Sequence, residues 1–280
     1  MIVLYYICRL MRRLPVILAF LSVLFAVLSC SDFRKIEKSE DWRVKYEAAL
    51  RYYGDEDYYR ASILFEQILP IVRGLPEGER VQFNLAYCHY HDRLYLLASE
   101  QFRTFYETYG RSPLAEEARF MFAYSLYAAS PGPNLDQTSS IEAMAAMQEF
   151  LNRFPRSEFA ERAMDVIAES QLKLEQKGFA NAAQYHKMRQ YNAAIVALNN
   201  FANNFPDSRF LEEAHFLIIE SEFKLAEQSV LSKQPERYKA VTEHYLEFLD
   251  RFPSSQYLKE AERYYAESLE KVNKLKSSNS

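Results

Sequence analysis

One fourteen-residue segment recurs four times along this chain of 280 residues. The three clear copies are FLNRFPRSEFAERA at 150–163, FANNFPDSRFLEEA at 201–214 and FLDRFPSSQYLKEA at 248–261. A fainter copy, FYETYGRSPLAEEA, stands at 105–118. This repetition constrains the fold strongly, because a single repeat cannot bury its apolar face alone and must stack on its neighbours.

The segments that contain these copies share one register, set by a small residue. The aligned small residues are Ala61, Ala98, Ala143, Ala194 and Val241. Three positions earlier stand Tyr58, Tyr95, Ser140, Tyr191 and Tyr238. Seven positions later stand Ile68, Phe105, Phe150, Phe201 and Phe248. Offsets of three and seven lie on one helical face, so these positions are predicted to form the core between neighbouring helices.

The end of each segment predicts a break between two helices. Proline or glycine stands twelve positions after the small residue in four of the five segments, and proline disfavours helical geometry in the residue before it. A serine follows two positions later and fits the N-cap of the next helix. The predicted caps are Ser112, Ser157, Ser208 and Ser254 or Ser255. The acidic GDED stretch at 54–57 is likewise interpreted as a turn rather than an acid site.

These features predict an all-α fold. We expect a right-handed α-solenoid of about five tetratricopeptide (TPR) repeats, each a pair of antiparallel helices, with a terminal capping helix. The predicted solenoid covers 41–275, with repeats at roughly 41–74, 76–110, 112–155, 157–206 and 208–253 and a cap at 255–275. Residues 30–40 are predicted to be a tether and residues 276–280 a disordered tail.

Residues 1–29 have the pattern of a secretory signal peptide. Three arginines among residues 1–13 precede a 16-residue apolar run at 14–29, which is short for a membrane span. The run ends at Cys30 in VLSC, which resembles the bacterial lipoprotein signal and predicts acylation of Cys30 after cleavage. The alternative is an uncleaved anchor with an incidental cysteine. Met11 is an alternative start that would give a more typical signal.

Cysteine usage argues against a fold held by disulfides, and charge argues against a nucleic-acid-binding protein. Cys8 lies in the signal and Cys30 at the lipid site, so Cys88 has no partner for an internal disulfide and is predicted to be a buried apolar residue. Removing residues 1–29 changes the formal net charge from −4 to −7. An acidic chain without a concentrated basic surface does not favour nucleic acid as a partner.

No enzymatic or metal-binding motif is present in the sequence. His89 and His91 are two residues apart and therefore point in different directions on a helix, which makes them a poor metal pair. The nucleotide-binding, hydrolase and zinc-protease motifs are missing as well. The sequence therefore predicts a protein that is not an enzyme and has no cofactor and no metal site.

Aromatic residues and arginines on the first helices of the early repeats are the candidate binding residues. By register they line the inner face of these helices, and an aromatic face with arginine suits an extended peptide with an apolar side chain and a terminal carboxylate. The candidates are Arg43, Tyr46, Tyr53, Arg80, Phe83, Tyr87 and Tyr90, followed by Tyr124 and Tyr127 in the next repeat. The alternative is ordinary packing between layers of an aromatic-rich solenoid.

Three stretches resemble one particular family of TPR lipoproteins. GDEDYYRASILFEQILP resembles the first repeat of the BamD (ComL) family, the TPR lipoproteins of the outer-membrane β-barrel assembly machinery. LDQTSSIEAMAAMQEFLNRFPRSEFAERA and FANAAQYHKMRQYNAAIVALNNFANNFPDS resemble later segments of that family. The resemblance covers nearly all of the chain after the signal, about 41–268.

The resemblance implies a scaffold at the outer membrane, lipid-anchored on the periplasmic face. Its C-terminal repeats would bind a BamA-like barrel protein, and its N-terminal repeats would receive unfolded outer-membrane proteins. The candidate partner-binding residues are Tyr191, Asn192, Asn199, Asn200 and Asn203. The family often carries an arginine on this helix, whereas NAAIVALNNFANNF has no charge, so the details of that contact depart from the family pattern.

Two other functions remain open at this stage. The chain could be a TPR lipoprotein adaptor for a different envelope complex, such as one for cell-wall synthesis or nutrient uptake. It could also be a glycan-binding surface lipoprotein, in which aromatic side chains would stack on sugars.

Overall fold

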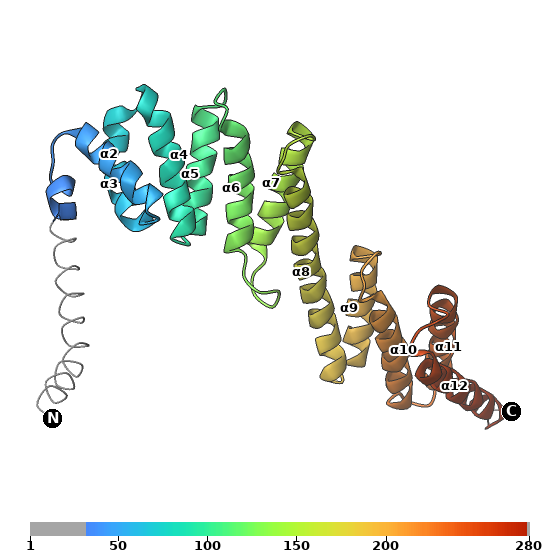
Figure 1. Ribbon diagram of the computed structural model, residues 1–280. Helices are drawn as coiled ribbons and strands as arrows, with labels where there is room; N and C mark the ends of the chain where they lie inside the picture. Colours follow the sequence, from blue (N-terminus) through green and yellow to red (C-terminus); the bar gives the residue numbers. More distant parts are fainter. Residues whose placement is uncertain (1–31, 279–280) are drawn as a thin grey trace, which may run out of the picture. The chain divides into compact units, whose positions relative to one another are not determined.

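The computed structural model describes residues 32–278, and within them it contains helices and no strand (Figure 1). Residues 32–37 form a short helical segment, and the numbered helices follow it. These are α2 (Trp42–Gly54), α3 (Tyr58–Val72), α4 (Pro76–His91), α5 (Tyr95–Thr108), α6 (Ala115–Ala129), α7 (Thr138–Arg153), α8 (Ala160–Lys187), α9 (Tyr191–Asn204), α10 (Leu211–Glu227), α11 (Gln234–Arg251) and α12 (Leu258–Ser278). The helices pack in consecutive pairs, so the predicted all-α repeat fold is confirmed.

The predicted signal peptide and Cys30 lie outside the described residues. Within residues 32–278, no helix is both long enough and apolar enough to cross a membrane. The described residues divide into two compact units, one made of 32–129 with 145–164 and the other of 130–144 with 165–278.

The predicted register matches the burial of the second helix in each pair. The aligned small residues Ala61, Ala98, Ala143, Ala194 and Val241 are all fully buried. The large residues seven positions later are buried as well, with 3% exposure at most. Ala61, Ala98 and Ala194 lie in the first turn of their helices, whereas α7 and α11 begin earlier relative to Ala143 and Val241. In all five helices the large residue stands two turns after the small one, so the apolar stripe follows a single helical face.

The tyrosines three positions before the small residue are less buried than predicted. Tyr238 and Ser140 are buried, but Tyr58, Tyr95 and Tyr191 are only half-buried. These residues begin α3, α5 and α9, where a side chain has fewer neighbours than in the middle of a helix. Their phenol groups are therefore available to other contacts.

The turn between repeats has the same hydrogen bonds at each of four places. The hydroxyls of Ser112, Ser157, Ser208 and Ser255 each accept a bond from the backbone N–H two residues later, at 3.0 to 3.2 Å. At the last turn the bonded serine is Ser255 rather than Ser254. Each of the four serines lies three residues before the helix that follows it, and the N-cap of α10 is Phe210, so the serines belong to the turn and the predicted N-cap position is wrong. Serine is suited to this place because its side-chain oxygen replaces the missing partner of a backbone N–H in the turn.

The acidic stretch at 54–57 is a turn, as predicted. It joins α2 to α3, and the Asp57 carboxylate accepts a hydrogen bond from the N–H of Arg60 at 3.2 Å. The same carboxylate pairs with the Arg60 guanidinium at 2.9 Å. Asp57 therefore caps α3, which is a structural role for this charge.

The most constant spacing in the chain runs from the second helix of one repeat to the first helix of the next. A small buried residue lies 27 positions after each aligned small residue, and these are Cys88, Ser125, Ser170, Ser221 and Ser268. All five are fully buried. The variation in repeat length therefore falls in the part of each repeat that follows this residue.

Cys88 is buried, and burial raises the pKa of its thiol to about 12. We expect the native protein not to react with a thiol reagent at pH 8, because a protonated, buried thiol is a poor nucleophile. Reaction with Ellman's reagent before and after denaturation measures this. Prompt labelling of the folded protein would contradict the prediction, and the Cys88→Ser variant is the control for labelling at any other group.

His89 is another buried group on α4. Its ring is 4% exposed, its Nδ1 atom has no hydrogen-bond partner, and burial lowers its pKa below the ordinary 6.5. The Glu66 carboxylate, 3.6 Å from Nε2, opposes this shift.

We expect this depressed pKa to make stability depend on pH. The unfolded chain binds a proton more readily than the folded one, so stability is complete above pH 6.5 and falls as pH decreases below it. Denaturant unfolding at pH 7.5, 6.5 and 5.5 measures the effect. The change in the free energy of unfolding with pH should be smaller in His89→Asn. The change that remains reports His91 and His215, because burial lowers their pKa values as well. Equal slopes in the two proteins would refute the assignment.

Candidate functional site

Half-exposed aromatic rings from α2, α3, α4 and α6 form one connected series of contacts. Tyr53 packs on Tyr58 at 5.7 Å, and Tyr58 stacks on His91 at 4.1 Å between ring centres. His91 also contacts Tyr87 and Tyr90, at 6.0 and 5.7 Å. We call this set, with two tyrosines of α6, the tyrosine strip: Tyr53, Tyr58, Tyr87, Tyr90, His91, Tyr124 and Tyr127.

The strip continues from α4 onto α6. Tyr90 lies 6.1 Å from Tyr124, and Tyr124 lies 5.7 Å from Tyr127. The guanidinium group of Arg162 stands 5.3 and 5.7 Å from these two rings, and it donates a hydrogen bond to the Tyr124 hydroxyl at 3.3 Å. Arginine against tyrosine is favourable both as a cation–π contact and as a hydrogen bond.

Charged groups of both signs stand beside the strip. The Tyr87 hydroxyl donates a hydrogen bond to the carboxylate of Glu117 on α6. The exposed Arg80 lies close enough to Tyr53 to oppose the rise of its pKa, whereas Glu117 adds to that rise. The strip therefore offers apolar ring faces together with a carboxylate acceptor and guanidinium donors.

The phenol groups of Tyr53, Tyr87 and Tyr90 stay protonated at neutral pH. Burial raises the pKa of Tyr53 to about 12 and that of Tyr90 to about 12. Burial also raises the pKa of Tyr87, and the hydrogen bond to Glu117 raises it further. These hydroxyls carry no charge, and those of Tyr53 and Tyr90 can donate a hydrogen bond to a bound chain, whereas that of Tyr87 already donates to Glu117.

The tyrosine strip does not include three of the predicted binding residues, Phe83, Arg43 and Tyr46. Phe83 is 7% exposed and packs on Phe105 at 5.1 Å, so its ring belongs to the core rather than to a binding surface. Arg43 and Tyr46 lie on α2 beside Trp42, with the Arg43 guanidinium 4.6 Å from the Trp42 ring and Tyr46 6.4 Å from it. The structure thus joins five residues of the predicted set into the strip: Tyr53, Tyr87, Tyr90, Tyr124 and Tyr127.

Sequence reasoning missed Tyr58, His91 and Glu117 as members of this site, and Tyr58 was predicted to belong to the core. His91 was considered only as a metal ligand, and within residues 32–278 no three His, Cys, Asp or Glu side chains converge as a metal site would require. One signal for His91 was available, because it lies four residues after Tyr87 and therefore on the same face of α4. Glu117 is 30 residues from Tyr87, and only packing of α4 on α6 brings them together.

The candidate partner-binding residues lie on α9. Asn192, Asn200 and Asn203 are exposed, and the exposed Val196 stands between them at helical spacing. Asn199 instead donates a hydrogen bond to the Ile195 carbonyl of its own helix at 2.9 Å. The half-buried Tyr191 contacts His186 at 5.7 Å. One uncharged face of α9 is thus open to solvent.

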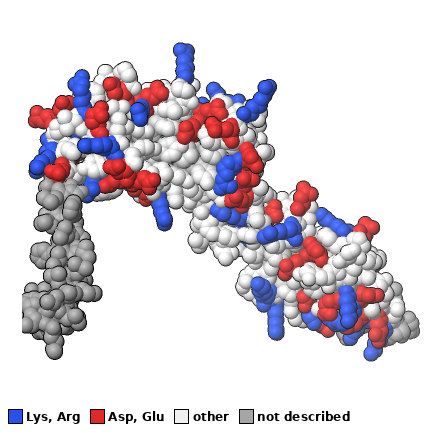
Figure 2. Space-filling view, in the orientation of Figure 1, with Lys and Arg blue, Asp and Glu red and all other residues white. Residues whose placement is uncertain are grey.

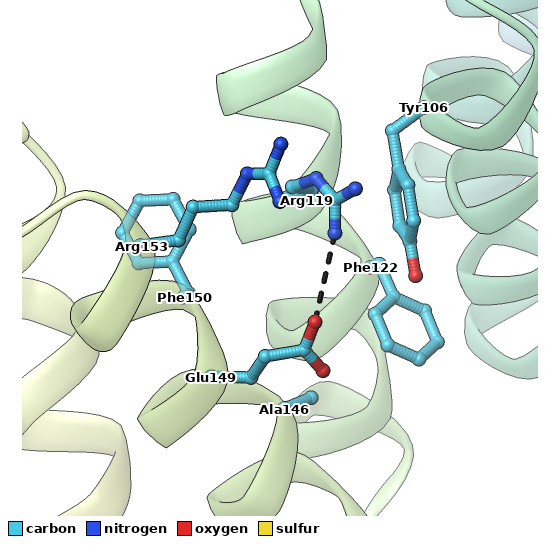
Figure 3. Close-up of a pocket in the computed structure, with 7 residues that line it drawn as sticks. All are labelled: Tyr106, Arg119, Phe122, Ala146, Glu149, Phe150 and Arg153. Carbon is cyan, nitrogen blue, oxygen red and sulfur yellow. Dashed lines mark ion pairs between the residues drawn. The ribbon is translucent and has the colours of Figure 1, made fainter. Parts of the chain in front are cut away.

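Cavities in the first unit are small or wide open. A cavity of about 10 Å³ between α5, α6 and α7 could hold one water (Figure 3). Arg119 lies over the Tyr106 ring at 4.1 Å and reaches the Glu149 carboxylate at 3.7 Å. Two open hollows, of about 590 and 320 Å³, lie at the turns that contain Ser112 and Ser157. None of these encloses a small molecule.

Charge is evenly mixed on the face shown in Figure 2, where acidic and basic side chains alternate over the helices. Such a surface suits recognition by local contacts rather than by a long-range field of one sign. Fold and site together define a helical-repeat protein with two candidate surfaces, the tyrosine strip and the exposed face of α9.

Comparison with known proteins places this repeat protein in a family. The model of the family YfiO, described as outer membrane lipoprotein, matches residues 39–196 and matches again at residues 175–274. Since the two matches together cover most of the chain, the protein belongs to the YfiO family of outer membrane lipoproteins. A search of curated proteins finds no match.

Proposed function

We propose that this protein is a non-enzymatic scaffold lipoprotein of the outer-membrane β-barrel assembly complex. Its family membership is the observation that carries the proposal. The sequence resemblance to the BamD family points in the same direction. In this proposal acylated Cys30 anchors the chain in the outer membrane on the periplasmic face, and the repeats bind other proteins there.

The N-terminal repeats are proposed to receive unfolded outer-membrane proteins at the tyrosine strip. Half-exposed rings beside guanidinium groups supply apolar contact area together with donors for a peptide carboxylate. Arg80 is the best-placed donor at the Tyr53 end, because it is exposed. The protonated phenols add further hydrogen bonds without opposing a negatively charged peptide end.

The C-terminal repeats are proposed to bind a BamA-like barrel protein through α9. Its exposed asparagines flank Val196, which is 57% exposed. A surface of this kind matches the usual composition of a protein interface, with an apolar centre and hydrogen-bonding groups around it. Because α9 carries no charge, this contact would depend little on salt.

Purification of the tagged, lipidated protein from its own cells in mild detergent tests the proposal. The expected co-purifying protein is a stoichiometric barrel protein with periplasmic domains, identified by mass spectrometry. Recovery of cell-wall enzymes or of nutrient-uptake proteins in its place would overturn the assembly role and would support an adaptor of another envelope complex.

Replacement of Tyr53 and Tyr87 by alanine tests the peptide site. We expect binding of a C-terminal peptide from a barrel protein to weaken by about tenfold or more, since each ring can contribute about 1 kcal/mol or more to an interface. Fluorescence anisotropy measures this. Tyr185→Ala, which removes a tyrosine that is 39% exposed on α8, is the matched control. Undiminished binding by the double variant would rule out the strip as the peptide site.

A further inference from the structure

The predicted tether contains a residue that is part of the folded body. Phe33 is 9% exposed and joins the core that contains Ala48 and Ala49 of α2. Its ring packs edge-on against Tyr52 at 5.7 Å, and the Arg60 guanidinium stands 5.6 Å from it. Arg60 is itself held by Asp57, so Phe33 is fixed from two helices.

Chain length then limits how far the first repeat can stand from a lipid on Cys30. Phe33 is three positions after Cys30, with Ser31 and Asp32 between them. A fully extended chain advances at most about 3.5 Å per residue, so this connection spans about 10 Å or less. An anchor with a longer free connection would let the repeats move away from the bilayer, whereas this one does not.

Exposed side chains that a headgroup layer would contact stand next to Phe33 and next to Arg60 in the chain. Arg34, Lys35 and Lys38 are exposed, although Lys35 also pairs with Asp32 at 3.3 Å. Tyr59, the residue before Arg60, is 68% exposed. Lysine and arginine bind lipid phosphates, and tyrosine is favoured at the boundary between an apolar and an aqueous phase.

We infer that one edge of the first repeat, residues 32–38 with Tyr59 and Arg60, lies directly on the phospholipid headgroups. The inference rests on the lipid anchor of the proposed function and adds an orientation to it. The lipid and Phe33 act together: the lipid holds the chain at the bilayer, and the packed ring transmits that position to α2 and α3. The partner of this surface is the headgroup layer, rather than another protein.

The test uses the full acylated chain in vesicles of phosphatidylethanolamine and phosphatidylglycerol that carry a headgroup nitroxide. A fluorophore is attached in the Cys88→Ser background to Tyr59→Cys or, as a control, to Arg111→Cys on the turn after α5. We expect several-fold stronger quenching at position 59. A twelve-residue Gly-Ser insertion between Ser31 and Asp32 should reduce quenching at position 59 to the control level, and Phe33→Ala should reduce it in part.

Mass spectrometry of Cys30 separates the possible failures. If Cys30 carries no acyl groups, the anchor is wrong and this inference falls with it. If Cys30 is acylated but quenching is equal at the two positions, or is unaffected by the insertion, this inference is wrong while the anchor stands. Quenching at position 59 that appears only when a partner protein is added would overturn it in favour of a protein contact.

Discussion

Gly78→Ala is expected to destabilise the protein by about 3 kcal/mol, within the range for forcing extra atoms into a packed site. Gly78 lies in the first turn of α4, and a β-carbon there would stand 2.4 Å from the Val72 carbonyl oxygen and 3.2 Å from its carbon. Both atoms are backbone, so a side-chain rotation cannot relieve the overlap. The turn itself would have to open, at the point where α3 passes to α4.

Denaturant unfolding followed by circular dichroism measures this loss, with Gly54→Ala as the matched control. Gly54 ends α2, and a β-carbon there meets no atom within 4 Å. Its substitution should therefore change stability by about 0.5 kcal/mol or less. If the two variants unfold at the same denaturant concentration, the close approach of Val72 to Gly78 does not exist in solution.

Phe105→Ala is expected to cost about 3 to 5 kcal/mol, as for other large aromatic residues removed from a core. Phe105 is fully buried two turns after Ala98 on α5. Its ring contacts Phe83 at 5.1 Å and Tyr109 at 5.2 Å. Removing it leaves a cavity between α4 and α5, and α4 carries three residues of the tyrosine strip.

Leu97→Ala is the control for Phe105→Ala, because it removes an apolar side chain from the same helix at a site that is 42% exposed. We expect a loss well below that of Phe105→Ala, since little of the removed surface was buried. Because repeat arrays transmit stability mainly between neighbours, hydrogen exchange should increase most in α4, α5 and α6. Equal losses in both variants would show that the register assigned to α5 is wrong.

Part of the candidate site could be predicted from helical register, and part could not. Tyr53, Tyr87 and Tyr90 were assigned to one face by their spacing, and the structure connects them through ring contacts. Phe83 was assigned to the same face but is buried, because α4 packs against α2, α3 and α5 and is covered on several sides. A period of 3.6 residues gives a direction around a helix but does not give the number of neighbours.

The N-terminal segment also shows that a sequence pattern does not give the number of neighbours of a residue. Residues 30–40 were predicted to be a tether, yet Phe33 packs on Tyr52 and belongs to the same core as Ala48. One aromatic ring is enough to fix a short segment when a half-covered core lies next to it. At the other end, α12 continues to Ser278, three residues beyond the predicted cap.

The sequence by itself determined the helices, the buried register from Ala61 to Val241 and the serine turns between repeats. Each of these depends on residues close together in the chain, through side-chain period, proline geometry and capping. Only the tertiary structure decided that Tyr58 stacks on His91, that Tyr87 bonds to Glu117 and that Phe33 joins the first repeat. Such contacts depend on how each helix is rotated and shifted against its neighbours, which the packing of the whole array sets.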